Sequence, residues 1–133
     1  MSDLVTDTHA LIWYLEDSPN LSVAANEAFD KCDGGEITIY IPTICLVEIV
    51  YLQERRRISA DMKYQLDTAL ASKSSGLALV NLTTEIVDVL STIPRDNVPD
   101  MPDRIIAATA RYMGLALISR DAKIVSSGIS IVW

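Results

Sequence analysis

Five short apolar runs constrain the fold of this chain more than any other feature of the sequence. Most of them are continuously apolar rather than alternating with polar residues. Continuous runs of this length are typical of strands that are covered on both faces in a parallel sheet. We therefore expect strands at residues 4–6, 37–41, 77–82, 115–118 and 129–132.

The segments between these runs have helical spacing of apolar residues, and we expect helices at 8–16, 21–31, 42–57, 59–73, 83–93 and 102–113. Pro42 suits a first helical turn and Ser59 an N-cap, while Gly76 and Gly114 suit C-caps. Alternating strands and helices predict a three-layer α/β/α domain with a mainly parallel central sheet of about five strands. The stretch between residues 41 and 77 is long enough for a helical hairpin.

The chain has 133 residues, which fits a single domain over residues 1–133. Half of the residues are hydrophobic, and this surplus suggests that a partner covers part of the surface. No apolar run reaches the roughly 18 residues that a membrane span needs. The first residues do not resemble a secretory signal, so we expect a cytoplasmic protein without membrane contact.

The formal net charge of −7 argues against attraction of the whole protein to a polyanion such as RNA. This objection weakens if the acidic residues are concentrated in a metal site. Bound divalent cations would then offset the negative charge and could reverse it locally.

Four acidic residues occur where a parallel sheet binds its ligands, near the carboxyl ends of strands. Asp7 and Asp121 follow the first and fourth expected strands, Glu48 lies in the helix after the second, and Asp103 opens the last helix. Carboxylates are preferred ligands of Mg²⁺ and Mn²⁺, and a bound cation relieves their mutual repulsion. Such an ion can activate a water towards a phosphodiester.

A structural explanation of the same residues is equally open at this point. Asp7 and Asp121 could cap helices, and Asp103 could stabilise a helix N-terminus through the helix dipole. Glu48 fits capping less well because it interrupts the apolar run from 44 to 52, where a carboxylate needs a partner or a metal.

Several motifs in order cover nearly the whole chain: Thr6–Trp13, Leu46–Ile49, Pro102–Ala110, Leu117–Asp121 and Ile131–Trp133. In this arrangement the sequence resembles PIN-domain ribonucleases, and within them VapC-type toxins of type II toxin–antitoxin systems. The resemblance implies a Mg²⁺-dependent endoribonuclease, with Mn²⁺ as a plausible substitute, that hydrolyses RNA with a metal-activated water. It also implies a homodimer and a cognate antitoxin that covers the apolar surface around residues 42–73 and blocks the acidic pocket.

The resemblance assigns catalysis and metal binding to Asp7, Glu48, Asp103 and Asp121. Asp7 and Asp103 would be direct ligands, whereas Glu48 and Asp121 would complete the site or bind through water. Four neighbours are expected to support a carboxylate or contact substrate: Thr6, Ser119, Arg104 and Arg120. Family members often carry small hydroxyl residues before the second acid, where this chain has Thr43 and Cys45, and Ser119 stands where threonine is common but keeps the hydroxyl. These departures leave the substrate preference open.

Two alternatives belong to other functional classes. One is a catalytically silent binding protein with the same fold. The other is a receiver-like signalling module, which would need a phosphoacceptor Asp and a Lys at strand ends, and the strands at 77–82 and 115–118 offer neither. Trp13, Tyr14, Tyr51 and Trp133 could stack on bases, although packing is the favoured role for most of them.

Overall fold

The computed structural model describes residues 2–133 and is built around a five-stranded sheet. The strands are β1 (Leu4–Thr6), β2 (Ile39–Pro42), β3 (Leu77–Val80), β4 (Ala116–Ile118) and β5 (Ile131–Val132). Their order across the sheet is β3-β2-β1-β4-β5, and every neighbouring pair is parallel. The expected parallel sheet is therefore confirmed.

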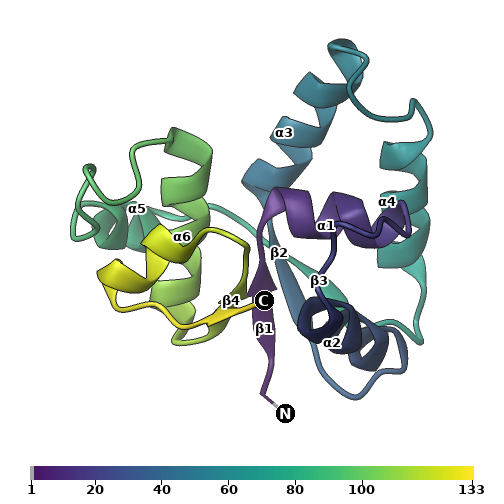
Figure 1. The fold of residues 1–133 in the computed structure, drawn as a ribbon, viewed down its shortest axis with the longest axis horizontal. Coiled ribbons are helices and arrows are strands. Elements are labelled where there is room, and N and C mark those ends of the chain that lie inside the picture. The colour runs from purple at the N-terminus through teal and green to yellow at the C-terminus, as the bar shows by residue number, and fades with distance from the viewer. Residues whose placement is uncertain (1) are drawn as a thin grey trace.

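Helices cover both faces of this sheet. They are α1 (Thr8–Leu15), α2 (Val23–Asp33), α3 (Thr43–Glu54), α4 (Met62–Ala71), α5 (Thr84–Leu90), α6 (Met101–Met113) and the 3₁₀ helix η1 (Ala122–Ser127). Figure 1 shows α1, α2 and α4 gathered on one side of the sheet, with α5 and α6 on the other. This arrangement confirms the three-layer α/β/α class. None of the helices within residues 2–133 has the length and apolar character needed to cross a membrane.

The middle strands supply the centre of the core. Val5, Ile39, Ile41, Leu117 and Ile118 are fully buried, which explains why these runs are apolar without alternation. The edge strand β3 is different, because Leu79 exposes 44% of its surface. Burial on both faces thus holds for the central strands and not for this edge.

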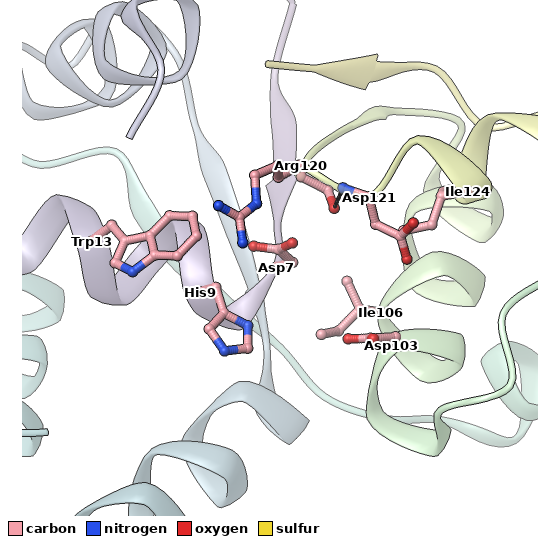
Figure 2. A pocket seen from close by; sticks show the side chains of 9 residues that line it. Asp7, His9, Trp13, Asp103, Ile106, Arg120, Asp121 and Ile124 are labelled. Atoms are coloured by element: carbon pink, nitrogen blue, oxygen red, sulfur yellow. Dashed lines mark hydrogen bonds between the residues drawn. The ribbon is translucent and has the colours of Figure 1, made fainter. Parts of the chain in front are cut away.

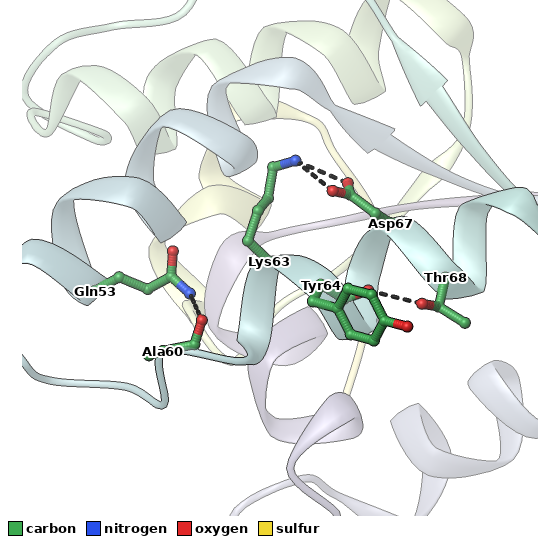
Figure 3. A network of polar contacts seen from close by, with 6 residues as sticks. All are labelled: Gln53, Ala60, Lys63, Tyr64, Asp67 and Thr68. Carbon is green, nitrogen blue, oxygen red and sulfur yellow. Dashed lines mark hydrogen bonds and ion pairs between the residues drawn. The ribbon is translucent and has the colours of Figure 1, made fainter.

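Helices α3 and α4 form the expected helical hairpin (Figure 3). The Gln53 side chain at the end of α3 donates from Nε2 to the carbonyl oxygen of Ala60 at 3.0 Å, ahead of α4. Within α4, Lys63 Nζ lies 2.7 Å from the Asp67 carboxylate. The hairpin is therefore joined by a hydrogen bond to its own connecting loop.

Pro42 and Ser59, which were expected to begin helices, lie outside them. Pro42 is the last residue of β2 and precedes α3 instead of opening it, because its extended backbone still pairs with Val80 of β3. Ser59 lies in the loop before α4, where its hydroxyl accepts a hydrogen bond from the backbone N–H of Asp61. It therefore stabilises the approach to the helix rather than capping it.

The two glycines that were expected to end helices have different roles. Gly114 follows α6 with a φ of 66°, a left-handed conformation that confirms its role as a C-cap. Gly76 stands beyond the end of α4, and a Cβ atom there would lie 2.0 Å from the carbonyl oxygen of Ile37. Glycine at this position permits the close approach of two backbones at the start of β3.

Candidate active site

The position of β1 in the middle of the sheet creates a point where the chain connections diverge. β2 and β3 lie on one side of β1, and β4 and β5 lie on the other. In open parallel sheets, ligands bind in the crevice at the carboxyl ends of the strands at such a point. The backbone N–H of Asp7 donates to the carbonyl oxygen of Ile118 at 3.1 Å, which ties the ends of β1 and β4 together.

Three of the four predicted acids line one cavity of about 190 Å³ at this crevice (Figure 2). Asp7 comes from the end of β1, Asp103 from the first turn of α6, and Asp121 from the loop after β4. The remaining lining residues are His9, Trp13, Ile106, Ser119, Arg120 and Ile124. We call this hollow the acidic cavity.

The same three acids also lie at helix starts, as the structural explanation expected. Asp7 Oδ1 accepts a hydrogen bond from the N–H of Ala10 at 2.9 Å, and Asp121 Oδ1 accepts one from Lys123 at 3.0 Å. Asp103 is not itself the cap of α6, because that role belongs to Asp100. Capping and lining the cavity are therefore compatible, and capping fixes the direction of two carboxylates.

Burial and mutual repulsion disfavour the charged forms of Asp7 and Asp103. Burial is the main cause that raises the pKa of Asp7, and the N–H of Ala10, the Ser119 hydroxyl and His9 act in the opposite direction. Burial, followed by the charges of Asp100 and Glu48, raises the pKa of Asp103 to about 6. Within residues 2–133 the one side-chain ion pair is Lys63–Asp67, so no basic side chain pairs with these carboxylates.

Glu48 lies in a neighbouring hollow rather than in the acidic cavity. This second hollow, which we call the apolar groove, is lined by Ile44, Val47, Glu48, Tyr51, Leu52, Arg55, Asp100, Met101 and Pro102. The buried Thr8 hydroxyl donates a hydrogen bond to Glu48 Oε1. Burial raises the pKa of Glu48, and this hydroxyl opposes the rise. The expected partner of the mid-helix acid is thus Thr8.

Thr8 was not identified from the sequence as a site residue. The contact joins the start of α1 to the middle of α3, residues that are 40 positions apart. No local pattern reveals such a pairing, because the position of Thr8 directly after Asp7 is equally consistent with an ordinary first helical turn.

Two of the expected supporting residues are not among those that line the cavity. Arg104 donates from Nε and Nη2 to the carbonyl oxygen of Ile93, at 3.1 and 2.9 Å. Arg104 therefore neither pairs with a carboxylate nor lines the cavity, because two of its N–H donors bind this backbone oxygen. Thr6 is fully buried and its hydroxyl donates to the carbonyl oxygen of Asp7, so it supports the backbone beside this acid.

The other two expected residues do line the cavity. The buried Ser119 hydroxyl accepts a hydrogen bond from the N–H of Asp121 at 3.1 Å, which shapes the turn that presents this carboxylate. The guanidinium carbon of Arg120 lies 4.8 Å from the centre of the Trp13 ring. The His9 ring is 5.8 Å from that of Trp13.

The chemistry of the donor set fits a hard divalent cation. The acidic cavity presents carboxylate oxygens whose crowding a cation would relieve. Among the described residues, however, no group of three or more His, Cys, Asp or Glu side chains is close enough together to hold an ion. Coordination by Asp7, Asp103 and Asp121 together would therefore require side-chain rearrangement.

Comparisons of the sequence and the fold with known proteins identify the family of this chain. The chain is 25% identical to Ribonuclease VapC22 of Mycobacterium tuberculosis (strain ATCC 25618 / H37Rv) over 124 residues, which is 93% of this chain and 91% of that protein. Its fold is similar to VapBC2 from Rickettsia felis bound to a promoter DNA fragment, with a TM-score of 0.73, 15% identity and coverage of 97% and 96% of the two chains. A toxin–antitoxin complex from Klebsiella pneumoniae gives a TM-score of 0.67, 21% identity and coverage of 98% and 96%. Residues 4–126 match the PIN domain, and the chain therefore belongs to the PIN domain family.

Proposed function

We propose that this protein is a metal-dependent endoribonuclease that acts as the toxin of a toxin–antitoxin pair. The observation that carries the proposal is the acidic cavity, in which Asp7, Asp103 and Asp121 converge where β1 and β4 end. A carboxylate whose pKa is raised to about 6 by burial and neighbouring charge is costly to the fold and is typical of a functional site. The similarity to a protein named as a ribonuclease indicates the reaction.

In this proposal Asp7 and Asp103 hold Mg²⁺, and Asp121 and Glu48 complete the site or act through water. When bound, the metal supplies an activated water and stabilises negative charge on the phosphodiester oxygens. The protein holds the carboxylates in fixed orientations, because the N–H groups of Ala10 and Lys123 donate hydrogen bonds to Asp7 and Asp121. Thr8 orients Glu48 from the side of the apolar groove.

We further propose that an antitoxin binds over the α3–α4 hairpin. Four exposed apolar side chains lie there: Val47, Val50, Tyr51 and Tyr64. Exposed apolar surface of this kind favours a protein partner, and two solved structures of similar fold are a VapBC complex and a toxin–antitoxin complex. A homodimer is part of the same proposal, and light scattering of the purified chain measures it.

The receiver-like alternative is wrong. Its strand order would be 2-1-3-4-5, whereas the order here is β3-β2-β1-β4-β5 and the sequence matches the PIN domain. The catalytically silent alternative predicts that the fold binds partners without cleaving RNA. The presence of all four acids gives no support to that alternative.

The test is an RNA cleavage assay with the purified protein. The probe is a pool of fluorescently labelled single-stranded RNA of mixed sequence, incubated with Mg²⁺ or with EDTA. We expect internal cleavage with Mg²⁺, none with EDTA, and growth arrest when this chain is expressed without an antitoxin. A well-folded protein that cleaves no RNA in Mg²⁺ or Mn²⁺ would favour the silent alternative.

A further inference from the structure

Arg120 is a basic side chain among acids with which it does not pair. It lines the acidic cavity next to Asp121 in the chain, and in the view of Figure 2 its guanidinium lies between the Trp13 ring and Asp7. Within residues 2–133, its guanidinium makes neither a hydrogen bond nor an ion pair with a carboxylate. An exposed arginine beside several carboxylates ordinarily pairs with one of them, so something else fixes its position.

The Trp13 ring accounts for that position. The guanidinium carbon lies 4.8 Å from the ring centre, within the range of a cation–π contact. The ring of Trp133 lies 5.8 Å from that of Trp13, and His9 lies at the same distance. Trp13 thus lies between the rings of His9 and Trp133, and its contact with Arg120 fixes the guanidinium at the rim of the cavity.

This contact leaves the edge of the guanidinium available. A planar guanidinium that rests on an aromatic ring keeps its N–H groups directed sideways, where they match the oxygens of a phosphate. The protein as a whole carries a net charge of −7, so an RNA strand gains little from its general electrostatics. A cation at the rim of the cavity would therefore have a large share in binding the strand.

We propose that Arg120 binds a backbone phosphate of the RNA strand beside the scissile bond, and that Trp13 is the positioning residue that keeps Arg120 off the carboxylates. This inference rests on the proposed nuclease function and adds to it the contact that recognises the substrate backbone. Because the contact is to a phosphate, it contributes affinity without base specificity.

The experiment compares cleavage of a labelled mixed-sequence single-stranded RNA by the wild type and by Arg120→Ala, Arg120→Lys and Trp13→Ala. Arg95→Ala is the matched control, because Arg95 is exposed and does not line the acidic cavity. We expect Arg120→Ala to raise KM about tenfold with a smaller change in kcat, and to reduce the salt slope of binding by about 0.7, the value for one phosphate contact on a single strand.

The conservative variant and the positioning residue sharpen the test. Arg120→Lys keeps the charge and should recover part of the lost affinity, though not all of it, because a lysine lacks the planar fork. Trp13→Ala should raise KM in the same direction. Combined with Arg120→Ala it should add nothing further, since both changes act through one contact.

A binding readout that does not depend on cleavage separates this inference from the proposed function. The chain has two tryptophans, Trp13 and Trp133, and both belong to this cluster. In the Asp7→Asn background, adding the RNA probe should change tryptophan emission, and Arg120→Ala should abolish that change. Absence of cleavage by the wild type would overturn the nuclease proposal alone, whereas binding and KM in Arg120→Ala equal to those of Arg95→Ala would overturn this inference alone.

Discussion

The acidic cavity and the apolar groove are formed partly by the same elements, yet they differ in the side chains that line them. The cavity holds Asp7, Asp103 and Asp121 without an ion pair among the described residues. The groove contains Glu48, whose carboxylate accepts a hydrogen bond from Thr8, set among side chains such as Val47, Tyr51 and Met101. Helix α6 contributes to both hollows, with Asp103 in the first and Met101 in the second.

This difference assigns separate tasks to the two hollows. A bound cation would reduce the electrostatic repulsion between the carboxylates, which suits the cavity for metal chemistry. A protein partner would remove the exposed apolar side chains from water, which suits the groove for docking. Because Glu48 lies in the groove, a partner seated there would contact a residue of the proposed catalytic set.

The largest expected effect is on cleavage after substitution in the cavity. Asp7→Asn and Asp103→Asn each remove a proposed metal ligand while preserving size, so we expect activity to fall by more than the ~100-fold that changes around a metal site can cause. Cleavage of labelled RNA is the measurement. Asp61→Asn, in the loop before α4, is the control and should retain activity. Full activity of either cavity variant in a folded protein would refute the site.

Metal binding should also stabilise the fold. Saturation at 100 times the dissociation constant raises the free energy of unfolding by about 2.7 kcal/mol. Thermal melting with and without Mg²⁺ measures this shift, which Asp103→Asn should remove. An equal increase in the melting temperature of wild type and variant would show that the ion binds elsewhere.

In the groove, removing the partner of Glu48 should have a smaller and mixed effect. Thr8→Val leaves a half-buried carboxylate without its donor, which we expect to cost about 1–3 kcal/mol of stability and up to ~10-fold in activity. Thr109→Val is the matched control, because that buried hydroxyl donates only to the carbonyl oxygen of Ile105 within its own helix. Denaturant unfolding and cleavage assays of both variants compare the two losses.

The fold could be predicted from the sequence because its signals are local. Continuous apolar runs indicated β1, β2 and β4, and Gly114 indicated the end of α6. Gly76 was misassigned because its role depends on a backbone from a distant segment, the carbonyl oxygen of Ile37. Tertiary contacts of this kind leave no periodic pattern in the chain.

The candidate site, like the fold, could be predicted from the sequence only in part. Strand ends and the family resemblance selected Asp7, Asp103 and Asp121, which the structure brings into one cavity. The separation of Glu48 into the groove, the turning of Arg104 towards Ile93 and the contact of Arg120 with Trp13 were not predictable. Each depends on a side-chain direction fixed by packing between elements, whereas the sequence indicates only which residues follow which strand.

The smallest expected effect is the pH dependence of the metal-free protein. The pKa of Asp103 is raised to about 6, above its ordinary value, and those of Asp7 and Glu48 are raised as well. The resulting stabilisation is fully present at low pH and is lost as the pH rises through about 6, where the Asp103 carboxyl ionises. Because Asp103 is partly exposed, solvent screening limits its share to about 1 kcal/mol or less.

Melting in EDTA at pH 5 and pH 7 tests this expectation. The wild type should melt at a lower temperature at pH 7, and Asp103→Asn should show a smaller difference because its amide does not ionise. Mg²⁺ should reverse the trend, since the cation binds the ionised carboxylates that destabilise the metal-free cavity. A melting temperature that rises from pH 5 to pH 7 without metal would mean that contacts within the protein stabilise the ionised carboxylates, which would contradict the raised pKa values of Asp7, Glu48 and Asp103.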